Sequence, residues 1–295
     1  MKFGMLLPTV GPLAAGPAAF DSLATIAQRA EALGFDSLWV PDHVVFPTVI
    51  NSRYPYNETG RIFLPADTPF LEPIAALGFL AGITKRVRLG PWVLVLPHRN
   101  PVVTAKMFST LDVLSKGRMI LGAGIGWMEE EITLLGAPFN KRGALSDEYL
   151  RAIKELWTKP DPQIDGQYVK FSGIKFEPKP VQKPLPVWIG GHSPRAMRRV
   201  VEFGDGWLAV PKSYAAFQES HEALKAAAVR AGRDVKSIPV IVSPMYVDSV
   251  DTYAEEIKRY QALGYDSFFA AIGFWAGDLK GILEVMDAFA RKMGM

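Results

Sequence analysis

The segment EALGFDSLWV at Glu31–Val40 is echoed near the other end of the chain by QALGYDSFFA at Gln261–Ala270. In each copy a helical run ends at a glycine, Gly34 or Gly264, and a short apolar run follows. Glycine is the preferred residue just past the last turn of a helix, where the backbone is often left-handed. The two copies therefore predict repeated units in which a helix leads into a strand.

On both sides of these copies, short apolar runs alternate with helical segments along the whole chain. Most of the runs are unbroken, which is typical of parallel strands buried on both faces. Eight such strands predict an α/β fold, a TIM-like (β/α)8 barrel forming one domain over residues 1–295, in preference to an open sheet. The predicted strands are Lys2–Leu7, Ser37–Val40, Arg88–Leu96, Met119–Ala123, Val187–Gly190, Gly206–Val210, Val240–Val247 and Ser267–Ala271.

Helices are predicted between these strands, and two of them begin at the capping residues Ser249 and Asp278. Two insertions interrupt the alternation. Val44–Pro73 follows strand two and has the length of a lid or binding element. Lys159–Pro186 precedes strand five and contains a predicted β-hairpin. The helices are expected at Asp21–Leu33, Leu145–Trp157, Pro194–Phe203, Ala215–Ala231, Ser249–Leu263 and Asp278–Met293.

Composition excludes several classes of function. The net charge of +3 over 295 residues is too small and too scattered to indicate a nucleic-acid partner. The absence of cysteine excludes disulfides, thiolate nucleophiles and cysteine-ligated metals. The four histidines lack metal-ligand spacing, so no metal site is expected.

The amino terminus is better explained as a first strand than as a signal peptide, because Gly4 and Pro8 interrupt its apolar run. No stretch approaches the ~20 apolar residues of a membrane span. We expect a cytoplasmic protein that acts on a small molecule.

Polar residues at the carboxyl ends of the predicted strands are the candidates for chemistry, because barrel enzymes place their active sites there. Strand two ends in Asp42 and His43. An imidazole titrates near neutral pH, which suits proton transfer, and Asp42 is in a position to orient the ring or shift its proton affinity. The alternative is that His43 only caps the strand or bonds the following loop.

Two glycine motifs follow later strands. In IGGHSP, Gly190 and Gly191 allow close backbone approach, and Ser193 opens a helix whose free N–H groups attract phosphate. The alternative is an ordinary tight turn. In GAGIGW, Gly124 and Gly126 permit an aromatic ring to lie against the backbone, but a dinucleotide-binding fingerprint is absent. Trp127 is either a wall of the site or part of the core.

Several stretches together resemble the luciferase-like monooxygenase superfamily, and more narrowly its branch that uses the 8-hydroxy-5-deazaflavin coenzyme F420. The resemblance runs from the first strand to about residue 210. The stretches that carry it are GFDSLWVPDHVVFPT, YPYNETGRIFLPADTPFLEP, VRLGPWVLVLPHRNPVVTAK, LDVLSKGRMILGAGIGWMEEE and PVWIGGHSPRAMRRVVEFGDGW.

This resemblance implies site roles for individual residues. Asp42 and His43 would be the acid–base pair beside the ring of the cofactor. A bulge in strand three, with a non-prolyl cis peptide between Trp92 and Val93, would support the back of that ring. Gly124 and Gly126 would lie on its pyrimidine side, and Gly190, Gly191, His192 and Ser193 on the phosphate side. Tyr54, Tyr56, Phe63 and Trp127 are expected to line the substrate pocket, with Phe70 also in the aromatic insertion.

Three functions remain open at this point. The first is an F420-dependent oxidoreductase that transfers a hydride, and the second is an FMN-dependent monooxygenase that uses oxygen. The third is a non-catalytic flavin-binding barrel, against which the Asp42–His43 pair argues. The resemblance also implies a homodimer. The face around Met107, Phe108 and Leu111 is one possible contact, with packing onto the chain's own barrel as the alternative.

Overall fold

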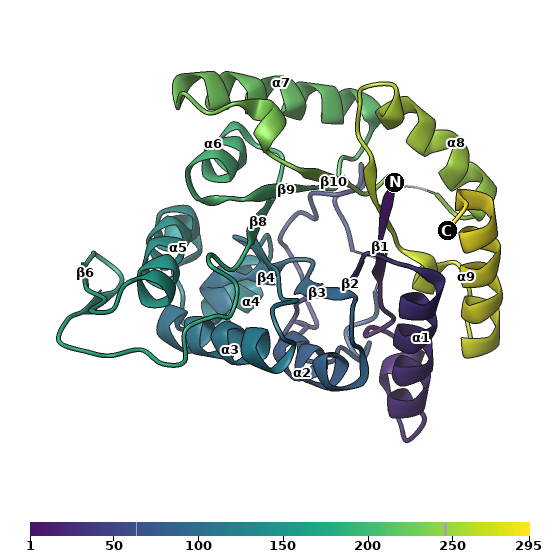
Figure 1. Ribbon diagram of the computed structural model, residues 1–295, viewed down its shortest axis with the longest axis horizontal. Coiled ribbons are helices and arrows are strands. Elements are labelled where there is room, and N and C mark those ends of the chain that lie inside the picture. The colour runs from purple at the N-terminus through teal and green to yellow at the C-terminus, as the bar shows by residue number, and fades with distance from the viewer. Residues whose placement is uncertain (63, 245–246) are drawn as a thin grey trace.

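Parallel strands form a closed ring in which neighbours in the chain are neighbours in space, with helices around the outside (Figure 1). This computed structural model describes residues 1–62, 64–244 and 247–295. The first strand pairs with the last, and a bridge between Leu89 and Met119 joins the two ends of the sheet. The strands in ring order are β1 (Lys2–Leu6), β2 (Ser37–Val40), β3 (Arg88–Pro91) with β4 (Leu94–Val95), β5 (Leu121–Gly124), β8 (Val187–Gly190), β9 (Gly206–Ala209), β10 (Val240–Val242) and β11 (Ser267–Ala270). The predicted TIM-like barrel is confirmed.

Strand three of the barrel consists of the two pieces β3 and β4. The break falls at the peptide bond between Trp92 and Val93, which is cis, and the expected bulge is therefore present. A 3₁₀ turn at Leu96–His98 follows the second piece, so the predicted strand Arg88–Leu96 ends one residue early. Because of the break, Val93 lies at the carboxyl-end rim between β4 and its neighbours.

Large and small residues alternate inside the barrel. Trp39 and Trp188 fill its interior together with Ile120, Leu208, Ile241 and Phe269. A Cβ atom on Gly90 would lie 2.8 Å from the Trp39 ring, and one on Gly206 would lie 2.6 Å from the Trp188 ring. These glycines are therefore required by the space that the indole rings occupy.

The helices confirm the capping predictions. Ser249 and Asp278 accept hydrogen bonds from the first turns of α8 and α9, and Gly34 ends α1 in left-handed backbone. Two helices of the described residues, α2 and α4, were not predicted, and α3 was expected only as a helical face around Met107, Phe108 and Leu111. Helix α2 is apolar all round and has no amphipathic period to detect. The helices are α1 (Ala19–Leu33), α2 (Pro73–Ile83), α3 (Pro101–Leu114), α4 (Glu129–Leu134), α5 (Arg142–Thr158), α6 (Pro194–Phe203), α7 (Tyr214–Arg230), α8 (Val250–Gln261) and α9 (Leu279–Met293).

The predicted strand Val240–Val247 was too long. The chain leaves the sheet after Val242, whereas the prediction continued to Val247. Pro244 lacks the N–H group that a continuing ladder needs, and residues 245 and 246 lie outside the described part. Phe108 and Leu111 of α3 are buried in the core, so packing onto the chain's own barrel is the correct alternative for them.

The insertion before strand five contains the predicted hairpin, formed by the antiparallel strands β6 (Ile164–Asp165) and β7 (Lys170–Phe171). It extends from the ring of helices at one side (Figure 1). The insertion after strand two forms a long loop, residues 44–72, in which no helix is described. Among the described residues, no helix is long and apolar enough to cross a membrane.

Candidate functional site

His43, just past the end of β2, is held by a buried carboxylate from a different part of the chain. Its Nδ1 donates a 2.7 Å hydrogen bond to Oε2 of Glu131, on α4. The His43 side chain is 14% exposed and that of Glu131 only 1%. Among the described residues, Nε2 of His43 has no hydrogen-bond partner. The second nitrogen is therefore available to a bound molecule.

Glu131 is ionised in this setting. Burial by itself raises the pKa of Glu131, but the hydrogen bond from His43 and the charges of His43 and His98 lower it below the ordinary value of a carboxyl group. Its other oxygen, Oε1, accepts the backbone N–H groups of Val44 and Val45 at 2.7 and 3.2 Å. One carboxylate thus fixes both the imidazole and the start of the long loop.

Asp42 does not orient His43, contrary to one of the two roles expected of it. Its fully buried carboxylate instead receives a bidentate pair from Arg99, at 2.7 and 2.9 Å, and the N–H of Val95 at 2.8 Å. Arg99 also donates to Glu72, the capping residue of α2, at 2.8 Å. Because both Asp42 oxygens are occupied, this residue joins β2 to the end of β4.

His98 lies between these two groups of charges. Its Nδ1 is 3.9 Å from Oδ2 of Asp42, and its Nε2 is 3.7 Å from Oε2 of Glu131. The side chain is 1% exposed, and Nδ1 has no hydrogen-bond partner in the described part of the chain. Burial lowers the pKa of His98, against the opposing effect of the two carboxylates.

Aromatic rings surround His43. Phe46 and Phe70 of the long loop meet the imidazole at centroid distances of 5.1 and 5.4 Å, and Trp127 meets it at 6.2 Å. Tyr54 packs edge-on against Trp127 at 5.1 Å and against Tyr56 at 5.4 Å. Of the four residues expected to line a substrate pocket, Trp127 thus contacts His43, and Tyr54 and Tyr56 are connected to it through Trp127. The fourth, Phe63, lies outside the described residues.

The glycines at the ends of β5 and β8 accommodate the side chain of Val93. A Cβ atom on Gly124 would lie 2.3 Å from Cγ2 of Val93, and one on Gly190 would lie 3.0 Å from Cγ1. Gly126 has a positive φ of 75°. Trp92 points into the barrel, where its ring stacks on Phe269 at 3.9 Å. Val93 and the glycines therefore form an apolar surface above a filled barrel.

The IGGHSP turn has the geometry expected from its sequence. Gly191 has a φ of 108°, and the Ser193 hydroxyl caps α6 by accepting the N–H of Ala196 at 3.2 Å. His192 is turned into the fold: its Nε2 accepts the N–H of Val210 at 2.9 Å, and its Nδ1 lies 3.2 Å from the Ser220 hydroxyl. Burial lowers the pKa of His192 to about 4, so its ring is neutral at neutral pH.

The long loop is attached to the barrel at both ends. Besides Glu131, Glu130 of α4 accepts the N–H groups of Asn51 and Ser52 at 2.7 and 3.1 Å. At the other end, Leu71 donates to the Thr9 carbonyl just after β1 at 2.9 Å. These bonds hold the aromatic residues of the loop over the carboxyl ends of β1, β2 and β5.

Glu131 is the residue that sequence reasoning missed. It belongs to the run Glu129–Glu131 after the GIGW turn, and consecutive acidic residues usually indicate a solvated face. The helical turn of α4 points only Glu131 inward, since Glu129 is exposed and Glu131 is buried. The available signal was its place in the segment that directly follows a barrel strand, β5.

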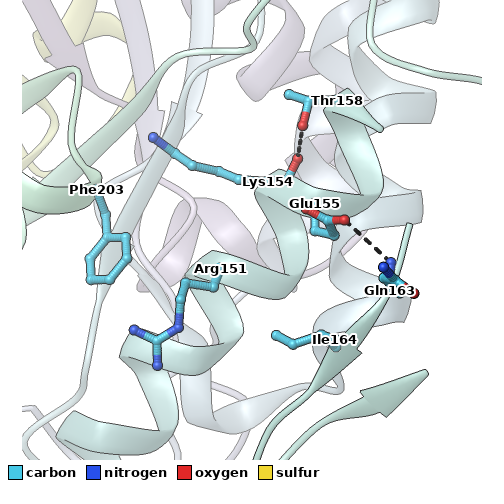
Figure 2. A pocket seen from close by; sticks show the side chains of 7 residues that line it. All are labelled: Arg151, Lys154, Glu155, Thr158, Gln163, Ile164 and Phe203. Atoms are coloured by element: carbon cyan, nitrogen blue, oxygen red, sulfur yellow. Dashed lines mark hydrogen bonds between the residues drawn. The ribbon is translucent and has the colours of Figure 1, made fainter. Parts of the chain in front are cut away.

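A surface pocket beside α5 lies apart from the site around His43 (Figure 2). Phe203, one of its lining residues, ends α6, which runs from the carboxyl end of β8 toward the amino end of β9. The pocket is thus at the opposite end of the barrel from His43. Its lining residues are Arg151, Lys154, Glu155, Thr158, Gln163, Ile164 and Phe203. In the described ranges, no group of three or more His, Asp or Glu side chains is arranged to hold a metal ion.

Comparisons with known proteins identify the family of the chain. The sequence model of the luciferase-like monooxygenase family matches residues 1–271. A Mycobacterium tuberculosis protein named only as uncharacterized is 33% identical over 244 residues, which cover 82% of this chain and 83% of that protein. The phthiodiolone/phenolphthiodiolone dimycocerosates ketoreductase of Mycobacterium bovis is 33% identical over 233 residues, which cover 76% of this chain and 59% of that protein.

Two solved structures share the fold. A monooxygenase from Streptomyces bottropensis superposes with a TM-score of 0.77 at 20% identity, covering 99% of this chain and 98% of that one. An F420-dependent secondary alcohol dehydrogenase superposes with a TM-score of 0.74 at 18% identity, covering 98% of each chain. The chain belongs to the luciferase-like monooxygenase family, whose members are oxidoreductases or monooxygenases.

Proposed function

We propose that this protein is an oxidoreductase that uses coenzyme F420 for hydride transfer to or from a small organic substrate at the carboxyl ends of the strands. The observation that carries the proposal is the setting of His43. One ring nitrogen is fixed by the ionised Glu131, and the other is unpartnered within the described residues and lies among aromatic rings. This is the arrangement of an acid–base group beside an apolar reactant.

The strand ends fit the deazaflavin. Val93 presents an apolar side chain that Gly124 and Gly190 allow to lie low against the backbone, which suits the face of a flat ring. Gly191 and the amino terminus of α6, capped by Ser193, suit the phosphate. His192 would contribute only through its backbone, because its ring nitrogens serve the fold. When bound, the deazaflavin supplies or accepts the hydride.

His43 would transfer the proton that accompanies the hydride. Glu131 accepts from Nδ1–H and so selects the neutral tautomer whose Nε2 can accept a proton; the protonated ring can donate from the same atom. Glu131 also ties this ring to the start of the long loop. The loop residues Tyr54, Tyr56 and Phe70, together with Trp127, would exclude water and favour an apolar or planar substrate.

The 33% identity to a ketoreductase supports the reductase over its alternative. The alternative is an FMN-dependent monooxygenase, which the family's description and the fold likeness to a monooxygenase favour. The two differ in the cofactor that the strand ends prefer.

A binding titration tests the proposal. The purified protein is titrated with the deazaflavin coenzyme and with FMN while its tryptophan fluorescence is followed. Tight binding of the deazaflavin and weak binding of FMN is expected, and the reverse would make the protein an FMN enzyme. Binding of neither would reject both. Trp127→Phe should reduce the signal, whereas Trp157→Phe, in the core beside α3, is the matched control.

Assembly and location stay predictions. We propose a homodimer, on the resemblance stated above, and a cytoplasmic location, which the absence of cysteine fits. Light scattering of the purified protein at several concentrations measures the assembly, and a mass equal to one chain throughout would reject the dimer.

A further inference from the structure

His98 is a buried ionisable group that the proposed proton transfer does not use. It belongs to the 3₁₀ turn after β4, and its ring lies between the carboxylates of Asp42 and Glu131. Both carboxylates are almost fully buried, at 0% and 1% exposed. The Nδ1 atom of His98 is left without a hydrogen-bond partner in the described residues. A buried polar atom of this kind requires an explanation.

The charges around His98 do not balance when both imidazoles are neutral. Asp42 and Glu131 each contribute a negative charge, and Arg99 contributes one positive charge through its bidentate pair with Asp42. In the described part of the chain, the other titratable group that acts on His98 is His43; Glu72, on the far side of Arg99, has a side chain that is 43% exposed. The buried groups therefore carry one net negative charge, which a single proton on either imidazole neutralises.

One atom connects the two rings. Oε2 of Glu131 is 2.7 Å from Nδ1 of His43 and 3.7 Å from Nε2 of His98. We propose that His98 is a positioning residue that sets the proton affinity of His43, because the two rings compete for one proton through this shared oxygen. His98 touches neither cofactor nor substrate in this role.

Burial disfavours the protonated form of His98. Burial penalises a charge on His98 more than one on His43, which is partly exposed, and the pKa of His98 is lowered accordingly. A positive charge on His43 lowers the pKa of His98 further. Removing the charge of His43 should let His98 take up the proton that the two carboxylates attract.

Nuclear magnetic resonance of the histidine rings tests this without turnover. The four ring Cε1–H signals of the intact protein are assigned with single variants and followed from about pH 4 to about pH 9, the range over which histidines titrate. In the wild type, His98 should titrate below the ordinary value of a histidine, because burial lowers its pKa. In His43→Asn, the pKa of His98 should rise by about one unit, since a charge on His43 lowers it in the wild type and neighbouring charges shift pKa values by about one unit or more.

Two further variants test whether the coupling between His43 and His98 depends on Glu131. Glu131→Gln should lower the pKa of both histidines, because both lose the same carboxylate. His221→Gln, which removes a histidine on α7, should leave both curves unchanged. The variant His98→Gln identifies the His98 signal by its loss. If that variant does not fold, His98→Asn identifies the signal in the same way.

Three results would overturn the inference: a His98 pKa that is the same with and without His43, no titration of His98 in either protein, or an effect of Glu131→Gln on His43 alone. The inference rests on the proposed acid–base role of His43. Its titration is independent of activity, so coupled rings in an enzyme that does not need His43 would reject the function and keep the coupling.

Discussion

Two histidines that follow barrel strands, His43 after β2 and His192 after β8, have opposite surroundings. His192 uses both ring nitrogens within the fold, one accepting from Val210 and one beside the Ser220 hydroxyl. His43 uses one nitrogen, on an ionised carboxylate, and its ring meets aromatic side chains. His192 is thus suited to hold a turn in place, and His43 is suited to exchange a proton with a bound molecule.

His43 and His192 both follow barrel strands, so a position at a strand end is not sufficient for a chemical role. What separates the two rings is how many of their nitrogens the fold has already used and whether the partner is charged. A carboxylate keeps an imidazole protonatable near neutral pH, whereas a neutral hydroxyl and a backbone N–H favour the uncharged ring.

The largest effect is expected from His43→Asn. Loss of the proton carrier should lower kcat by about 10²–10⁴-fold while cofactor affinity changes little. Steady-state kinetics and a cofactor titration measure the two quantities. His221→Asn, on α7, is the control. Unchanged turnover in His43→Asn would reduce His43 to a structural role like that of His192.

A smaller loss is expected from Glu131→Gln. The amide cannot supply the negative charge that fixes the His43 tautomer, so kcat should fall by about 10–10³-fold, less than in His43→Asn because the imidazole remains. The pH at which activity is half-maximal should also fall, as the imidazolium loses its counter-charge. A variant with full activity and an unshifted pH profile would contradict the role of Glu131.

The buried His192 should lower the free energy of unfolding at acidic pH. The folded protein keeps this ring neutral until its pKa of about 4, whereas the unfolded chain takes up a proton near pH 6.5. The unfolded state binds more protons between these values, so the free energy of unfolding should decrease as the pH falls through that window, by at most about 3 kcal/mol. Denaturant unfolding at several pH values should show a weaker dependence in His192→Gln; an equal dependence would contradict the assignment.

The smallest effect is expected from Gly191→Val in the turn that contains His192. Its φ of 108° and a Cβ placed 3.0 Å from Ala196 would move the turn, and cofactor affinity should weaken by about tenfold, or about 1.4 kcal/mol. Gly264→Val, with a φ of 88° and open space around it, is the matched control for backbone strain. Equal affinities of the two variants would reject the phosphate placement.

The barrel and the positions of the candidate site residues along the chain could be predicted without the structure. Strand periodicity, the glycine caps and the capping residues act within a few neighbouring positions, so the order of elements and the turn around Ser193 could be predicted from the chain alone. The resemblance to a known family added the cis bond between Trp92 and Val93, which the structure confirms.

Which side chains meet across the ends of the strands depends on how the barrel closes, and it could not be predicted from the sequence. Asp42 and His43 are adjacent in sequence, yet one bonds Arg99 and the other bonds Glu131, which is 88 residues away. Nothing local distinguishes Glu131 from the two glutamates before it. Barrel closure brings α4 against the end of β2, and the burial and hydrogen bonds made there determine which carboxylate orients the imidazole.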